Sequence, residues 1–103
     1  MHGPVFHLLG LSQRAGKVAA GDFAVRQQLA RGKVKLLIVA ANTSERIKQD
    51  YVQMGRSKNV PVVLALTKEA LGCALGKSPR AAVAVLDENF ARGIQGLLEK
   101  GEK

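Results

Sequence analysis

The stretch LGCALGKSPR at residues 71–80 contains a Gly-Lys-Ser tripeptide, which ends the phosphate-cradling loop of many nucleotide-binding proteins. That loop needs four residues between its first glycine and the tripeptide, so that its backbone N–H groups surround a phosphate. Only three residues separate Gly72 from Gly76, and Leu71 occupies the position of the first glycine. The context is also wrong, because a helical pattern precedes the stretch and an apolar strand pattern follows it. We therefore predict no nucleotide site here, although a basic, glycine-rich turn still suits some other phosphate-bearing partner.

The remaining side chains with catalytic potential form no constellation. His2 and His7 lie at the start of the chain and the single cysteine, Cys73, lies far from both, so the spacing matches no metal site. We interpret Cys73 as a small packing residue and Asp87 as a helix cap. The sequence thus predicts neither an enzyme nor a bound cofactor.

Positive charge is the strongest compositional signal. The chain carries 16 Lys and Arg against 8 Asp and Glu, a net charge of +8. A small, strongly basic protein favours a polyanionic partner, most often nucleic acid, although charge can also serve solubility alone. Between Gly10 and Lys35 the only acidic residue is Asp22, and the basic residues are Arg14, Lys17, Arg26, Arg31, Lys33 and Lys35.

The lone cysteine excludes an internal disulfide and fits a reducing compartment. No apolar run approaches the ~20 residues of a membrane span. We therefore expect a cytoplasmic protein with no membrane partner.

Helical and strand patterns alternate along the chain, from a helix at the start to a helix at the end. The patterns predict helices within residues 5–17, 22–31, 42–59, 68–75 and 88–101, and strands at 18–21, 34–41, 60–66 and 81–87. The expected helix caps are Asp22, Thr43 or Ser44, Thr67 and Asp87. The continuous apolar runs at 34–41, 60–66 and 81–87 are typical of strands that are buried on both faces. The order predicts one α/β domain over residues 1–103, built as a three-layer α/β/α sandwich.

Two segments are placed to bind an anion together. The helix that begins at Gly21 directs its free N–H groups and positive dipole end outward. The turn from Lys77 to Arg80 carries two cations and forms a basic pocket with that helix if the two segments lie side by side. The alternative is a solvated, charged surface with no ligand.

Three phrases carry a resemblance to a known family. They are AGKVAAGDFAVRQQLARGKVKLLIVAANTS, VPVVLALTKEALGCALG and AAVAVLDENFARGI, and the chain resembles over residues 8–98 the ribosomal-protein superfamily that binds kink-turn RNA. The phrases GLSQRAGK and DENFA are typical of its bacterial YlxQ-like branch. The resemblance implies an α/β/α sandwich with a mixed, four-stranded sheet, and it implies RNA as the partner.

The family's RNA contacts come from two segments. The turn that follows Leu-Gly-x-Ala-x-Gly is matched at Leu71, Gly72, Ala74 and Gly76. The Gly-x-Asn-Glu-x-x-Lys start of the second helix is matched only at Gly21, because Phe23, Ala24 and Gln27 replace its Asn, Glu and Lys. The resemblance and the charge pattern together imply this RNA-binding set: Gly16, Lys17, Gly21, Asp22, Phe23, Arg26, Gln27, Gly72, Gly76, Lys77, Ser78, Pro79 and Arg80.

The departures at the helix start weaken the expectation of kink-turn specificity. Base-edge contacts contribute ~1–3 kcal/mol of discrimination each in duplex readout. Basic side chains would still hold phosphates with less preference for sequence. Phe23 either stacks on a base that is not paired or packs in the core.

Three hypotheses follow. The leading one is a non-catalytic, monomeric RNA-binding protein that joins a ribosomal or other ribonucleoprotein assembly. The second is a protein-interaction module on the same fold, with Phe23 and Ala24 facing a protein. The third, a nucleotide- or small-molecule-binding enzyme, has the least support in the residues.

Overall fold

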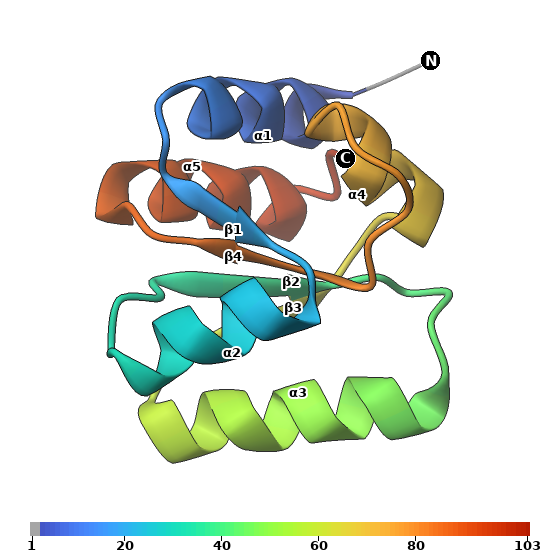
Figure 1. Cartoon of the computed structure of the whole chain (residues 1–103). Coiled ribbons are helices and arrows are strands. Elements are labelled where there is room, and N and C mark those ends of the chain that lie inside the picture. Colours follow the sequence, from blue (N-terminus) through green and yellow to red (C-terminus); the bar gives the residue numbers. More distant parts are fainter. Residues whose placement is uncertain (1–2) are drawn as a thin grey trace.

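Helices and strands alternate in the predicted order (Figure 1). The computed structural model describes residues 3–103, so His2 lies outside the described residues. The elements are α1 (Pro4–Arg14), β1 (Val18–Ala20), α2 (Asp22–Ala30), β2 (Leu36–Val39), α3 (Glu45–Lys58), β3 (Val62–Leu64), α4 (Lys68–Ala74), β4 (Ala82–Val85) and α5 (Glu88–Glu99).

The four strands form one mixed sheet in the order β1-β4-β2-β3. β4 pairs antiparallel with both β1 and β2, whereas β2 and β3 are parallel. Helices α1, α4 and α5 cover one face and α2 and α3 cover the other (Figure 1). The predicted α/β/α sandwich and its mixed sheet are therefore confirmed.

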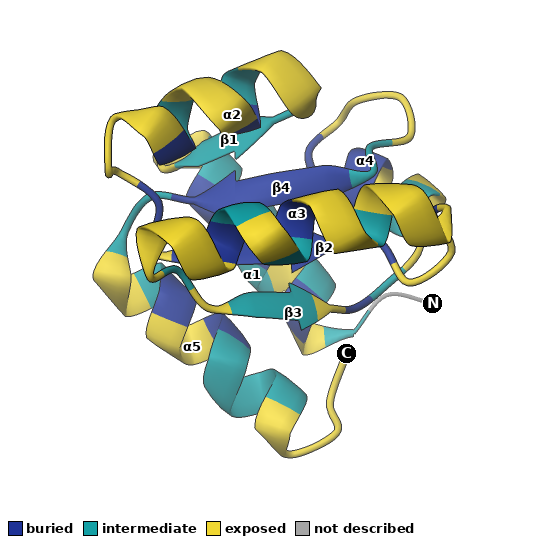
Figure 2. Ribbon diagram, turned by 90° about the horizontal axis from the view of Figure 1, so that it is seen from below, coloured by how far each residue is buried: buried dark blue, intermediate teal, exposed yellow. Residues whose placement is uncertain are grey.

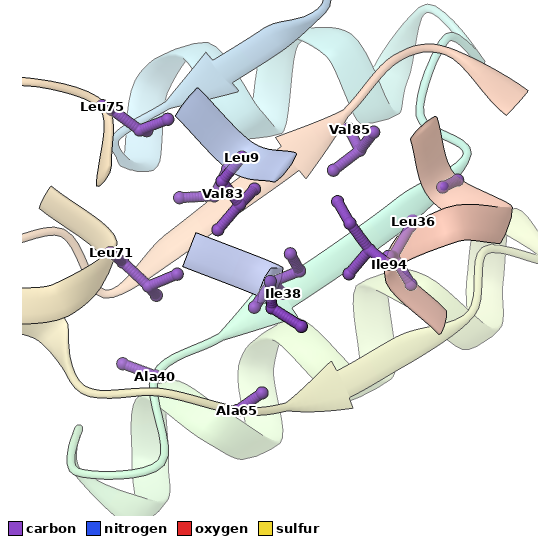
Figure 3. Close-up of a cluster of buried hydrophobic side chains, with 12 residues drawn as sticks. Leu9, Leu36, Ile38, Ala40, Ala65, Leu71, Leu75, Val83, Val85 and Ile94 are labelled. Atoms are coloured by element: carbon purple, nitrogen blue, oxygen red, sulfur yellow. The ribbon is translucent and has the colours of Figure 1, made fainter. Parts of the chain in front are cut away.

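Side-chain alternation along the central strands builds a separate core on each face. Successive residues of a strand point to opposite faces, so Leu36 and Ile38 face α1, α4 and α5 while Leu37 and Val39 face α2 and α3. Figure 3 shows the first core, in which Leu9, Leu71 and Ile94 meet these strands from three helices. Every residue of β2 and β4 is buried, as expected for strands covered on both sides (Figure 2).

Three predicted helix caps are present. The side chains of Ser44, Thr67 and Asp87 each accept a hydrogen bond from a backbone N–H three residues later, at 3.0–3.3 Å. Ser44, not Thr43, is thus the cap of α3. A capping side chain satisfies one of the N–H groups that the first helical turn leaves without a partner.

Two predictions about burial are wrong. The run at 60–66 yields only a three-residue strand, β3, whose side chains are half-buried or exposed, because it lies at the edge of the sheet. Leu64 at its end is 51% exposed. Cys73 is exposed on α4 and does not pack in the core, because the buried side of α4 is formed by Leu71 and Gly72.

None of the helices described between residues 3 and 103 has the length and apolar character needed to cross a membrane.

Candidate functional site

The Gly-Lys-Ser tripeptide is part of a helix cap. Gly76 follows the end of α4 with a left-handed φ of +68°, and its N–H donates to the Cys73 carbonyl at 3.0 Å. The Lys77 N–H donates to the Gly72 carbonyl at 2.8 Å. These two bonds define a Schellman motif, which uses glycine where L side chains are strained. The two amides are therefore engaged with the helix and are not available to cradle a phosphate.

The turn from Lys77 to Arg80 lies directly on α4 because Gly72 has no side chain. A Cβ at Gly72 would clash with the Ser78 carbonyl and would lie 2.9 Å from the Lys77 carbonyl oxygen. Arg80 folds back over the turn, with Nη1 donating to the Ser78 carbonyl at 2.9 Å and to the Ser78 hydroxyl at 2.6 Å. Arg80 thus stabilises the turn that presents Lys77 to solvent.

The helix start at Gly21 lies against this turn. Gly21 has φ 93° and ψ 155°, a conformation that is essentially restricted to glycine. Its N–H donates to the Ala82 carbonyl at 3.5 Å, and a Cβ added to it would lie 3.8 Å from Arg80 Nε. The antiparallel pairing of β1 with β4 places Ala20 opposite Val83, so the end of β1 meets the start of β4. The two segments that were predicted to lie side by side do so.

Asp22 does not cap α2 as predicted. Gly21 holds the cap position, and Asp22 is the first helical residue, with its carboxylate turned toward α3. Its Oδ1 accepts from the Tyr51 hydroxyl at 2.6 Å and from Arg26 Nε at 2.8 Å. These hydrogen bonds, from Tyr51 first and Arg26 second, lower the pKa of the Asp22 carboxyl below its usual value of 3.8. Burial, together with the bond to Asp22, raises the pKa of the Tyr51 hydroxyl.

Arg26 is drawn into the groove between α2 and α3 by this network. Its guanidinium lies 5.8 Å from the centre of the Tyr51 ring, and it lines a cavity of about 190 Å³ together with Ile47 and Ala81. The pairing with Asp22 compensates its charge locally. Arg26 was predicted as an RNA contact. In the structure it joins α2 to α3 through its contacts with Asp22 and Tyr51.

Phe23 and Gln27 form the outward face of α2. Phe23 is 79% exposed, which rules out the core-packing interpretation. Gln27 is also exposed and follows at i+4, so the two side chains are neighbours on the helix. An exposed aromatic ring beside an amide offers both stacking and hydrogen bonding next to the basic turn.

Gly16 and Lys17 do not belong to this surface. Gly16 ends α1 with φ +72°, and the Lys17 carbonyl accepts from the Leu86 N–H at 2.8 Å. Lys17 therefore lies at the other end of β1, four residues and ~13 Å of extended chain from Gly21. Of the basic residues between Gly10 and Lys35, Arg26 lies near Gly21, whereas Lys17 lies at the opposite end of the sheet.

One contributor to this end of the sheet carries no signal in the sequence. The Asn42 amide accepts from the Lys68 N–H at 2.8 Å and donates to Glu69 at 3.1 Å, and the Lys68 carbonyl accepts from the Arg80 N–H at 3.1 Å. Lys68 is thereby fixed beside the turn. An internal backbone hydrogen bond and the Asn42 bond lower the pKa of Glu69, so a charged carboxylate also lies here. Only the fold brings these residues together.

Known proteins share both this sequence pattern and this architecture. Residues 5–94 match the model of the ribosomal protein L7Ae/L30e/S12e/Gadd45 family. The chain is 31% identical over 94 residues to the RNA-binding protein YlxQ of Bacillus subtilis, covering 91% of this chain and 94% of YlxQ. It is 34% identical over 89 residues to the large ribosomal subunit protein eL30 of Methanocaldococcus jannaschii, covering 84% and 80% of the two chains.

A solved structure matches over almost the whole chain. A protein of unknown function from Bacillus halodurans superposes with a TM-score of 0.90 at 28% identity, covering 95% of this chain and 99% of its own. The order of elements, the two glycine-dependent segments at one end of the sheet and the match over residues 5–94 lead to one conclusion. The chain belongs to the ribosomal protein L7Ae/L30e/S12e/Gadd45 family.

Proposed function

We propose that the chain binds structured RNA through the Gly21–Arg80 surface, which consists of Gly21, Phe23, Gln27 and the turn from Lys77 to Arg80. The observation that carries the proposal is the contact between Gly21 and Arg80, with an added Cβ at Gly21 only 3.8 Å from Arg80 Nε. The contact joins two segments that are 59 positions apart in the chain into one surface. Similarity to an RNA-binding protein, YlxQ, and to a ribosomal protein, eL30, supports RNA as the ligand.

Each part of the surface has a distinct chemical task in this proposal. Lys77 contacts phosphates, which contributes affinity without reading sequence. Phe23 stacks on a base that has left its helix, a contact worth ~1–3 kcal/mol in single-strand binding. Gln27 both donates and accepts, so it reads a base edge beside the stacked ring.

The proposed RNA is bent or looped, and its recognition is less specific than that of a kink-turn. Phe23, Ala24 and Gln27 stand where the family pattern has Asn, Glu and Lys. The change removes one carboxylate and one amide that would read base edges and replaces them with a ring and a methyl group. Sequence discrimination therefore falls, while backbone contact and stacking remain.

The decisive experiment is a filter-binding titration of total ribosomal RNA at several salt concentrations. We expect Lys77→Glu with Arg80→Glu to weaken binding strongly and to make the salt dependence shallower, because phosphate contacts are lost. Lys77→Glu alone should act in the same direction without removing the hydrogen bonds that Arg80 makes within the turn. Lys100→Glu with Lys103→Glu is the control of equal charge change. Affinity and salt slope equal to those of the control would reject the placement.

The exposure of Phe23 favours a second candidate function, docking of a protein at the same surface. A ring that is 79% exposed beside the half-buried Ala24 would contribute apolar area to a protein interface. Pull-down of the chain from cell extract with and without RNase separates the two functions. Partners that survive RNase and are lost in Phe23→Ala would favour protein docking, whereas partners released by RNase favour RNA.

A further inference from the structure

A second group of cations gathers at the end of the sheet opposite Gly21. The ends of α1, α2 and α3 and the starts of β1 and β2 all lie at this end, on the left in Figure 1. We define the Lys17–Lys35 surface by the exposed cations of these segments: Arg14, Lys17, Arg31, Lys33, Lys35 and Lys58. Five of the six belong to the basic Gly10–Lys35 stretch of the sequence.

Backbone hydrogen bonds hold Lys17 and Lys35 on either side of β4. The Lys17 carbonyl accepts from the Leu86 N–H at 2.8 Å, and the Lys35 N–H donates to the Val85 carbonyl at 2.8 Å. β1 and β2 are the two neighbours of β4, so the two lysines are separated by two strand spacings, ~10 Å. The backbones of Lys17 and Lys35 are thus anchored to the middle of the sheet.

The helix caps add two more fixed positions. The Lys33 N–H donates to the Gln28 carbonyl at 3.1 Å and the Gly32 N–H to the Leu29 carbonyl at 3.1 Å, the same Schellman pattern that ends α4. Arg31 is the C-cap residue of α2. Lys58, in the last turn of α3, lines a hollow with Leu29 and Ala30 and so lies beside the end of α2.

These cations have no acidic partners. Among residues 3–103, the ion pairs join Arg26 to Asp22, Lys48 to Glu45 and Arg92 to Glu88, and none involves the Lys17–Lys35 surface. Two acidic residues, Asp87 and Glu88, follow β4, and both have other partners. Asp87 caps α5 through Phe90 N–H, and Glu88 pairs with Arg92 at 3.4 Å.

Compensation of helix dipoles does not account for the whole group. Arg14 and Lys58 lie in the last turns of α1 and α3, where a cation interacts favourably with the helix end. That effect fades beyond the last turn. Lys35 follows the end of α2 by five residues, next to the buried Val34, and so lies beyond the last turn of that helix.

We propose that the Lys17–Lys35 surface binds the phosphate backbone of a second RNA segment, so that the chain bridges two segments from opposite ends of its sheet. The inference rests on the proposed function of the Gly21–Arg80 surface and extends it. The Lys17–Lys35 surface consists of lysines and arginines, and none of its six residues is aromatic. It therefore contacts phosphates and reads no bases. Six cations that lack acidic partners at one end of a small protein match a polyanion in charge.

The test uses immobilised total ribosomal RNA and a labelled short RNA duplex of arbitrary sequence. The protein is first bound to the immobilised RNA, the duplex is added, and the captured label is measured. We expect the wild type to capture the duplex and Lys17→Gln with Lys35→Gln to capture several-fold less while staying on the immobilised RNA. In direct titration with the duplex, the same variant should show a salt slope shallower by about 1.4–1.8, if each lysine contacts one phosphate.

Matched variants separate the two proposals. Lys100→Gln with Lys103→Gln removes two exposed charges elsewhere and should capture the duplex like the wild type. Lys77→Gln with Arg80→Gln should keep its affinity for the free duplex and should bind the immobilised RNA only as weakly as it binds the duplex, because the Lys17–Lys35 surface contacts phosphates of any sequence. If that variant binds the immobilised RNA as tightly as the wild type does, the Gly21–Arg80 assignment is wrong, and the direct duplex titration still decides the second surface.

Two outcomes would overturn the inference. One is equal duplex capture and equal salt slope for Lys17→Gln with Lys35→Gln and for the wild type. The other is that Lys17→Gln with Lys35→Gln captures the duplex like the wild type but fails to bind phosphatidylserine vesicles that the wild type binds. That result would assign the surface to anionic lipid.

Discussion

The hydroxyl of Tyr51 donates a hydrogen bond of 2.6 Å to Oδ1 of Asp22 and so ties the middle of α3 to the first turn of α2. Tyr51 is 3% exposed, whereas Asp22 lies at the surface beside Gly21. The bond therefore connects the α2–α3 core to the helix start that forms half of the proposed RNA surface. It helps to fix the position of α2 against α3.

Removing this hydrogen bond should weaken the attachment of α2 to α3. We expect Tyr51→Phe to lower the free energy of unfolding by about 1 kcal/mol, the net value of one hydrogen bond, since the exposed Asp22 carboxylate can turn to water. Urea unfolding at neutral pH measures the loss. Asp22→Asn, which keeps an acceptor at the same place, is the matched control and should cost less. If Asp22→Asn lowers the free energy of unfolding as much as Tyr51→Phe does, the charge of Asp22, and not the Tyr51 hydroxyl, provides the stabilisation.

The same bond makes stability depend on pH at both extremes. The Tyr51 pKa is raised in the folded chain, so its contribution is complete below the ordinary value of 10.0 and is lost as the pH rises from there toward the folded pKa. The Asp22 pKa is lowered, so its contribution is present above 3.8 and is lost as the pH falls below that value. Unfolding free energies should fall above pH 10 in the wild type, and Tyr51→Phe should lack that part of the decline. Parallel curves for the two proteins would contradict the assignment.

The backbone at Gly21 should not tolerate a side chain. Its φ of 93° with ψ of 155° is accessible essentially to glycine alone, so we expect Gly21→Ala to cost ~1–3 kcal/mol. For a chain of this size the melting temperature should fall by ~4–8 °C for each kcal/mol. Gly96→Ala is the control, because Gly96 lies inside α5 and a Cβ there meets nothing within 4 Å. That substitution should raise the melting temperature, since alanine favours helix interiors.

A Cβ at Gly72 should displace the turn that follows α4. The clash is with the backbone of Ser78, which cannot rotate away as a side chain can. Gly72→Ala should therefore reduce RNA affinity as well as stability. Gly76→Ala strains a left-handed position but meets nothing within 4 Å, so it should cost ~1 kcal/mol of stability with less effect on affinity. Unfolding and filter-binding titrations of both variants test the difference, and equal losses of affinity would show that the turn need not lie on α4.

Phe23 should matter for RNA binding and not for folding. The ring is 79% exposed, so Phe23→Ala should change the unfolding free energy by less than ~0.5 kcal/mol, as is usual for surface positions. RNA affinity should fall by ~1–3 kcal/mol if the ring stacks on a base. Phe23→Tyr keeps an aromatic face and should retain affinity, whereas Phe23→Leu keeps apolar area only and should not. Retention of RNA affinity by the leucine variant would argue against stacking.

Local signals in the sequence determined the elements of this protein. The order of nine elements, the caps at Thr67 and Asp87 and the buried runs of β2 and β4 follow from periodicity and capping chemistry, which act over a few residues. The stretch at residues 71–80 was distinguishable from a phosphate-binding loop by its glycine spacing and by the helical and strand patterns on either side of it. The pairing of β4 with both β1 and β2 is a long-range event, and no nearby residue encodes it.

The tertiary structure decided which charges share a surface. Sheet order places Gly21 against Arg80 and moves Lys17 to the opposite end of β1, although Lys17 is much closer to Gly21 in the chain. An extended strand separates its ends by ~3.3 Å per residue, so neighbours in sequence become distant, while antiparallel pairing brings remote residues together. The same long-range packing turns Asp22 from a cap into a partner of Tyr51, leaves β3 at an edge and exposes Phe23 and Cys73.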